Sequence, residues 1–225
     1  MRYVISGMNG SLSQLKRIIN KIQAEDSDAI FILLGNQMRD SFSWELLSWM
    51  MQNVTPNGKY QAVLSREGFT ILEWYNNKYL PYRQGVITQF PFVERETSSV
   101  LYHAKSLDHK DIVELADFYK SLPAFKRAYA TRGEITHTYY IVESWVNNKL
   151  LKGYDIQNRL TAEDLRSMLE YCLYFPVDYQ DYADGRYRII RADYNGYAYE
   201  RRDTIAMAVD SPYVFCIDTE KFYGG

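Results

Sequence analysis

Residues 1–22, MRYVISGMNGSLSQLKRIINKI, decide the fold of this protein. The aromatic and β-branched run from Tyr3 to Ile5 predicts a short strand that stops at Ser6-Gly7. Leucines and isoleucines then recur at helical spacing from Leu12 to Ile22, which predicts a helix. The loop between them has the form of a metal-binding turn, yet none of its side chains can hold a metal ion tightly.

The same pattern continues through the first third of the chain. The continuous apolar run Ala29 to Leu34 predicts a strand buried on both faces. A helical pattern follows from Trp44 to Met51, and Tyr60 to Leu64 predicts a third strand. The order β-α-β-α-β indicates an open α/β sheet with parallel strands.

Ligands of such sheets bind at the loops that follow the carboxyl ends of the strands. In this chain those loops are Ser6 to Gly10, Gly35 to Ser41 and Ser65 to Gly68. We therefore expect the functional site at these three loops.

The rest of the chain predicts further helices and strands without an internal repeat or a linker. A helix is expected from His109 to Ser121, followed by a hairpin of Phe125 to Ala130 with Thr136 to Val142. Another helix, capped by Thr161, is expected to run to about Tyr174. Three late strands are expected at 187–190, 204–209 and 213–217.

Composition limits the class of protein. With 225 residues, 47% of them hydrophobic, the chain can bury a core as one domain, residues 1–225. The formal net charge of -2 and the absence of a basic run argue against nucleic-acid binding. No apolar run is long enough to cross a membrane, and two cysteines suggest no disulfide framework, so a cytoplasmic location is expected.

Taken in order, the three loops resemble those of the PPP-type metallophosphatases of the calcineurin-like fold. The closest group in size and layout comprises the bacterial serine/threonine phosphatases and bis(5'-nucleosyl)-tetraphosphatases. The family loops read GDIHG, FLGDYVDRGPDS and GNHE, and the matching segments here are SGMNG (6–10), LLGNQMRDSFSW (33–44) and SREG (65–68). The family's hairpin from SLP to VHAG and its terminal IDTGxxYGG resemble residues 121–145 and IDTEKFYGG (217–225).

The resemblance covers essentially the whole chain. It implies an α/β sandwich of two mixed β-sheets flanked by helices. It also implies where the ligands of two metal ions should stand. Gly7 and Asn9 take the places of the aspartate and histidine of the first loop, and Asn36 that of the bridging aspartate. In the third loop, Arg66 replaces the asparagine and Glu67 the general-acid histidine.

The remaining positions that the resemblance maps have changed as well. Glu143 replaces the histidine of VHAG, and the last histidine falls near Ala192. The family's phosphate-clamping Asp-Arg pair stands here as Arg39-Asp40.

These changes remove the donors that the family's chemistry requires. Two metal ions would activate a bridging water and hold the phosphoryl oxygens. Gly7 and Ala192 offer no donor, Asn9 and Asn36 offer only neutral oxygens, and a guanidinium such as that of Arg66 repels a cation. We therefore expect a catalytically inactive pseudophosphatase without a metal cofactor, acting as a binding or regulatory module.

Two alternatives concern what the changed loops do instead. In the first, Glu67, Glu143 and Asp193 gather a single metal ion, and the protein is an active metal-dependent phosphohydrolase.

In the second alternative, arginines replace the metal ions. Arg39, Arg66 and Arg191 lie in or beside the same loops and could bind a phosphoryl or nucleotide ligand. The interpretation that the sequence favours is that these arginines pair with Glu67, Glu143 or Asp40 and fill the pocket.

A tyrosine-rich segment suggests a protein partner. Eight tyrosines fall between Tyr171 and Tyr199, interleaved with Asp, Gly and Arg. Tyrosine and arginine are enriched at protein interfaces. The segment either packs on its own domain or forms a partner surface, and a purely structural interaction module is a third hypothesis for the whole protein.

Overall fold

The computed structural model describes residues 1–35, 43–91, 99–103, 106–143, 187–193, 199–201, 204–208 and 212–223. The expected helix at 161–174 lies outside this part of the chain. So does the tyrosine-rich segment, apart from 187–193 and Tyr199.

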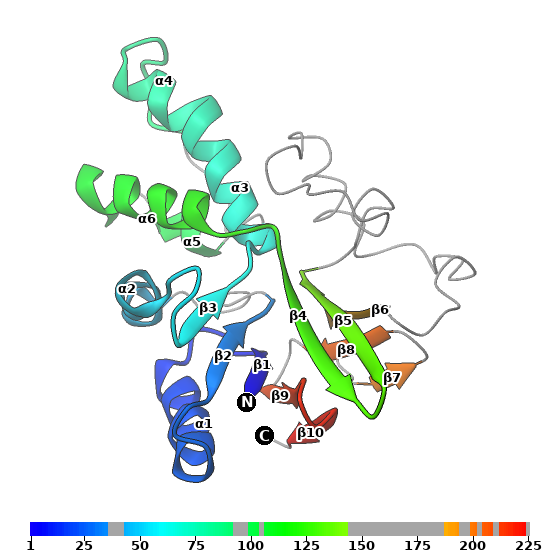
Figure 1. Ribbon diagram of the computed structural model, residues 1–225. Coiled ribbons are helices and arrows are strands. Elements are labelled where there is room, and N and C mark those ends of the chain that lie inside the picture. The colour runs from blue at the N-terminus through cyan, green and yellow to red at the C-terminus, as the bar shows by residue number, and fades with distance from the viewer. Residues whose placement is uncertain are drawn as a thin grey trace.

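The first sheet, called sheet A here, has the strand order β10-β9-β1-β2-β3 (Figure 1). Strands β1, β2 and β3 run parallel, whereas β9 and β10 are antiparallel to their neighbours. The strands span Arg2–Ser6 (β1), Ile30–Leu33 (β2), Tyr60–Ala62 (β3), Tyr213–Cys216 (β9) and Lys221–Tyr223 (β10).

The second sheet, sheet B, has the order β4-β5-β6-β8-β7 and is also mixed. The β4–β5 hairpin and β7–β8 are antiparallel, while β5, β6 and β8 run parallel. The strands span Phe125–Arg132 (β4), Ile135–Val142 (β5), Tyr187–Asp193 (β6), Tyr199–Arg201 (β7) and Thr204–Ala208 (β8).

Helices cover the face of sheet A that points away from sheet B (Figure 1). Apolar side chains of α1, α2, α3 and α6 belong to the same buried core cluster as Tyr3, Ile5, Phe31 and Leu33 of the sheet, and this burial stabilises the fold. The helices span Leu12–Glu25 (α1), Trp44–Asn53 (α2), Arg66–Trp74 (α3), Leu80–Arg83 (α4), Ser99–His103 (α5) and His109–Ser121 (α6), with a π-helical turn η1 at Tyr75–Tyr79 joining α3 to α4.

A second core fills the space between the two sheets. Val4 and Ile32 of sheet A face Tyr139, Ile141 and Ile190 of sheet B across it, and all five are buried. The chain is thus a mixed α/β structure in which sheet A is covered on both faces. This confirms the α/β class with two mixed sheets flanked by helices that the sequence indicated.

Within the described ranges, the expected β-α-β-α-β unit, the helix at His109–Ser121 and the hairpin are confirmed. The expected loop Ser65 to Gly68 is wrong in one respect. Ser65 is the N-cap of α3, and its side-chain oxygen accepts a hydrogen bond from the Gly68 N–H at 3.1 Å. The sequence patterns also missed β7 and β10, which have only three residues each.

No helix in the described part of the chain is both long and apolar enough to cross a membrane.

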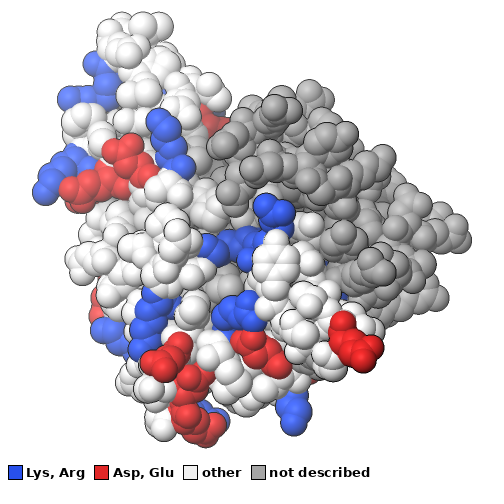
Figure 2. All heavy atoms as spheres, viewed as in Figure 1, with Lys and Arg blue, Asp and Glu red and all other residues white. Residues whose placement is uncertain are grey.

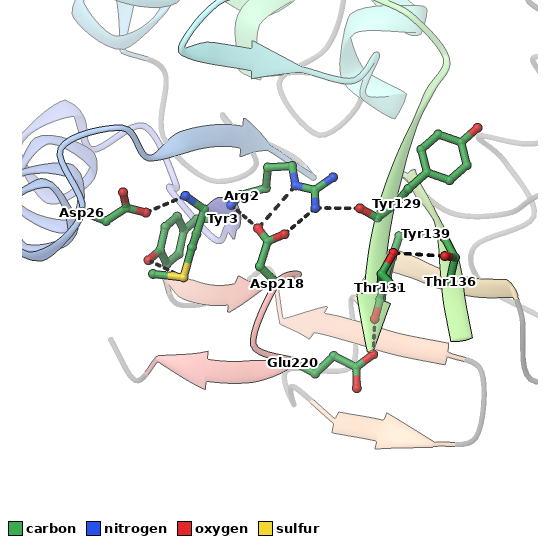
Figure 3. A network of polar contacts seen from close by, with 10 residues as sticks. Arg2, Tyr3, Asp26, Tyr129, Thr131, Thr136, Tyr139, Asp218 and Glu220 are labelled. Carbon is green, nitrogen blue, oxygen red and sulfur yellow. Dashed lines mark hydrogen bonds and ion pairs between the residues drawn. The ribbon is translucent and has the colours of Figure 1, made fainter. Parts of the chain in front are cut away.

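Polar contacts join the two sheets at the amino-terminal end of β1 (Figure 3). The Arg2 guanidinium forms an ion pair with Asp218 and donates to the Tyr129 carbonyl of β4 at 2.7 Å. Nearby, the Tyr139 hydroxyl donates to the Glu220 carboxylate. These contacts fix sheet B against the β9–β10 turn of sheet A.

Substitution of Asp218 by Asn should test the Arg2 contact. Burial alone disfavours the Asp218 carboxylate, but hydrogen bonds from Arg2 and its charge outweigh this and lower the pKa of Asp218. The ionised carboxylate therefore stabilises the folded state at pH values above the ordinary aspartate pKa. This stabilisation is lost as the pH falls through the lower pKa of Asp218 in the folded state. We expect Asp218→Asn to lower the free energy of unfolding at pH 7 by about 2 kcal/mol, measured by urea denaturation.

The difference between wild type and Asp218→Asn should shrink below about pH 4, because Asp218 of the unfolded chain then becomes protonated, and it should fall further as the pH passes through the lower pKa of the folded state. Asp28→Asn, at an exposed position, is the matched control. A difference that stays constant from pH 7 to pH 3 would argue against the ionic contribution.

Candidate functional site

The loop after β1 lies at the carboxyl edge of sheet A and has an unusual backbone. Gly7, Asn9 and Gly10 all have positive φ angles, of 71°, 43° and 76°. Glycine adopts this region without strain, and asparagine tolerates it better than most residues do. Ser11 then caps α1 by accepting a hydrogen bond from the Gln14 N–H. The sequence thus forms a sharp strand-to-helix turn in which Gly7 and Asn9 adopt positive φ angles.

The third segment of the expected site, Ser65 to Gly68, forms the start of helix α3. Arg66 and Glu67 are the first two residues of α3, and the Arg66 side chain is exposed while Glu67 is half-buried. A carboxylate in the first turn is favourable because the helix N-terminus carries partial positive charge. The backbone N–H of Leu64 donates to the carbonyl of Pro123 at 2.8 Å, which joins this edge to the segment after α6.

Glu143 directly follows β5 and is the one charged residue among the described residues whose whole side chain is buried. Its carbonyl accepts a hydrogen bond from the Ala192 N–H at 3.0 Å. Tyr119 of α6 lies near both Glu143 and Glu67. Its burial, and then the negative charges of these two residues, raise the pKa of the Tyr119 hydroxyl, so the phenol stays protonated.

Sequence reasoning missed Tyr119 as part of this site. It falls within the expected helix at 109–121, where periodicity indicates burial but not a neighbour. Glu143 lies 24 positions further along the chain, and no local pattern connects the two residues.

Gly68 allows α3 to approach Tyr119 closely. A Cβ atom at Gly68 would lie 2.3 Å from Cδ1 and 2.6 Å from Cε1 of the Tyr119 ring. A side chain larger than hydrogen therefore cannot fit without a shift of the ring or the helix.

Ala192 and Arg191, two expected site residues late in the chain, have side chains on opposite faces of sheet B. Ala192 lies within β6, paired with Met207, and its side chain is buried in the core between the sheets. Arg191 is the preceding residue, so alternation places its side chain on the other face of sheet B, in register with Val142 of β5. Glu143, two residues after Ile141, is on the core side instead.

Other expected positions fall outside the described residues, namely Asn36, Arg39 and Asp40 of the second loop. Of Asp193, only the backbone in β6 is described. Among the side chains that the structure describes, no group of three His, Cys, Asp or Glu residues could hold a metal ion. At this edge of the sheet, the described fold brings the ionisable groups of Tyr119, Glu67 and Glu143 near one another.

Charge is spread over the visible surface. Figure 2 shows basic and acidic side chains of the described residues interspersed on one face of the molecule. This agrees with the formal net charge of -2.

Comparisons with known proteins support the fold alone. No protein-family model matches the sequence, and no curated protein does. Among solved structures, the chain is similar to the crystal structure of hypothetical protein PH1004 from Pyrococcus horikoshii OT3, with a TM-score of 0.56 and 12% sequence identity. The similarity covers 99% of this chain and 86% of the other.

Introducing a methyl group at Gly68 should disturb the contact between α3 and α6. Alanine favours helices, yet the overlap with Tyr119 should dominate, so we expect Gly68→Ala to destabilise the protein by about 1 to 3 kcal/mol. Thermal and urea unfolding would measure this.

The double variant Gly68→Ala/Tyr119→Leu provides the control for that contact. Because leucine removes the ring atoms, the two substitutions together should cost less than the sum of the single effects. Additive effects would show that Gly68 and Tyr119 do not constrain each other.

Proposed function

We propose that this protein is a catalytically inactive relative of the calcineurin-like metallophosphatases and acts as a binding or regulatory module. The observation that carries the proposal is the chemistry of the carboxyl edge of sheet A. Gly7 and Asn9 occupy a tight turn there, and Arg66 begins α3 where the family has a metal ligand. A sandwich of two mixed sheets is consistent with this family.

Electrostatics argues against a binuclear centre at this edge. Two dications require several negative or imidazole donors to offset the loss of their hydration. Gly7 supplies none, Asn9 supplies a neutral amide, and Arg66 adds a positive charge. Glu67 and Glu143 are the carboxylates beside Tyr119, and two are too few for a site of this kind.

A phosphoryl-bearing group is the ligand class that we favour for this edge. Arg66 is exposed, so it is available to solvent rather than filling the interior. It stands at the start of a nine-residue helix, where backbone N–H groups also favour anions. Arginine can bind phosphate oxygens through two parallel hydrogen bonds without a metal.

The alternative function, an active phosphohydrolase with a reorganised metal site, rests on one observation. The negative charges of Glu67 and Glu143 both raise the pKa of the Tyr119 hydroxyl, so two carboxylates lie in the neighbourhood of one residue. A single divalent ion bound there could polarise a phosphoryl oxygen.

Metal content and hydrolysis should separate these two functions. After incubation with excess manganese and desalting, we expect substoichiometric metal by mass spectrometry and no hydrolysis of an aryl phosphate above background. The reason is that the described edge lacks enough anionic donors.

Glu67→Gln and Glu143→Gln are the informative variants for this test, and Glu45→Gln in α2 is the control. Stoichiometric manganese with turnover that the first two variants abolish and the third retains would establish the active phosphohydrolase instead.

Phosphoryl binding at Arg66 should be visible by calorimetry with inorganic phosphate and a nucleoside monophosphate. We expect Arg66→Ala to weaken binding roughly ten-fold, because one charge-assisted bidentate contact is lost. Arg83→Ala, which removes an exposed arginine from α4, should leave the affinity unchanged. Equal affinity of wild type and Arg66→Ala would show that Arg66 does not bind the phosphoryl group. That result would not bear on catalysis, which the metal test addresses.

A further inference from the structure

A cavity of about 440 Å³ lies between α1 and the β9–β10 side of sheet A. Tyr3, Val214 and Tyr223 of the sheet line it, together with Ile18 and Ile22 of α1. Charged side chains of α1 also line it, namely Arg17, Lys21 and Glu25. Its volume falls in the range of protein ligand sites, and it combines an apolar interior with charged groups at the helix surface.

Strand β10, next to this cavity, is an edge strand among the described strands. It pairs with β9 on one side, and it is the last strand in the order of sheet A. Tyr223 is in register with Val214, and both belong to the core on the α1 face of the sheet. Phe222 points to the opposite face, into the core between the sheets.

Geometry connects the strand edge with the cavity. A further strand paired with β10 would lie about 4.8 Å beyond it, and every second side chain would point to the α1 face. A side chain beside Tyr223 would therefore enter the space that Tyr223 and Ile18 line. Peptides that add a strand to a sheet gain affinity from backbone hydrogen bonds and specificity from pockets for alternate side chains.

The charges near the cavity select the kind of peptide. Arg17 and Lys21 are exposed on α1, and Lys221 is exposed on the same face of β10 as Tyr223. Glu25 is the single carboxylate among the residues that line the cavity. A lysine on an edge strand discourages indiscriminate pairing, and together these cations complement an acidic strand.

We propose that the β10 edge binds an extended acidic peptide segment of another protein, which adds a strand to sheet A and places an apolar side chain in the cavity beside Tyr223. Tyr3, at the start of β1, lines this cavity, whereas the candidate phosphatase-like site follows the end of β1. The peptide site therefore does not depend on the function proposed for the other edge.

Selection from a random dodecapeptide library displayed on phage, with the full chain immobilised, would test the proposal. Enriched peptides should alternate acidic with aromatic or branched residues. Their affinity for the chain would be measured by fluorescence anisotropy, and hydrogen exchange should show added protection at residues 221–223. Because two favourable charges become unfavourable, Arg17→Glu/Lys21→Glu should weaken binding at least about ten-fold.

Two further variants keep the test specific. Ile18→Trp fills the cavity without changing charge and should also weaken binding. Lys78→Glu/Lys120→Glu reverses the charge of two exposed lysines that do not line the cavity, and this double variant should leave peptide binding unchanged. Circular dichroism and thermal unfolding would show that each variant is folded.

Three results would overturn the proposal. The first is a selection that enriches no acidic peptide. The second is an enriched peptide that binds wild type and Arg17→Glu/Lys21→Glu equally or protects residues away from β10. The third is a concentration-dependent dimer that Ile18→Trp abolishes, because a second copy of this chain would then occupy the edge.

Discussion

The two-sided burial of β1 is the constraint on which the rest of the structure depends. Tyr3 and Ile5 face the helices, and Val4 faces sheet B, so this short strand contributes to both cores. Parallel strands such as β1 and β2 are stable when both faces are covered. The helices meet this requirement on one side and sheet B meets it on the other.

The same constraint explains the backbone of the candidate site. The turn after β1 must pass from a buried strand into α1 within a few residues, and its positive φ angles are the consequence. That conformation depends on Gly7 and Gly10 rather than on a metal ligand. Side chains at the edge can therefore change while the strand-to-helix path remains.

Contacts at the other end of β1 compensate for local strain. Glu220, in the turn between β9 and β10, has a positive φ of 52°, and this conformation costs roughly 1 kcal/mol for such a residue. Its carboxylate accepts a hydrogen bond from Tyr139 and lies 3.4 Å from the Arg188 guanidinium. The residue that strains the turn thus also attaches it to sheet B.

The sequence by itself determined the elements whose signals are local and strong. Apolar runs and helical periodicity were sufficient for β1, β2, α1 and α6, and turn residues were sufficient for the β4–β5 hairpin. Only the tertiary structure decided the rest. The three-residue β10 exists because β9 offers hydrogen-bonding partners, and the start of α3 at Arg66 depends on the Ser65 cap and on Gly68 packing against Tyr119. The proximity of Tyr119 to Glu67 and Glu143 joins residues far apart in sequence, and no periodic pattern records a contact of that kind.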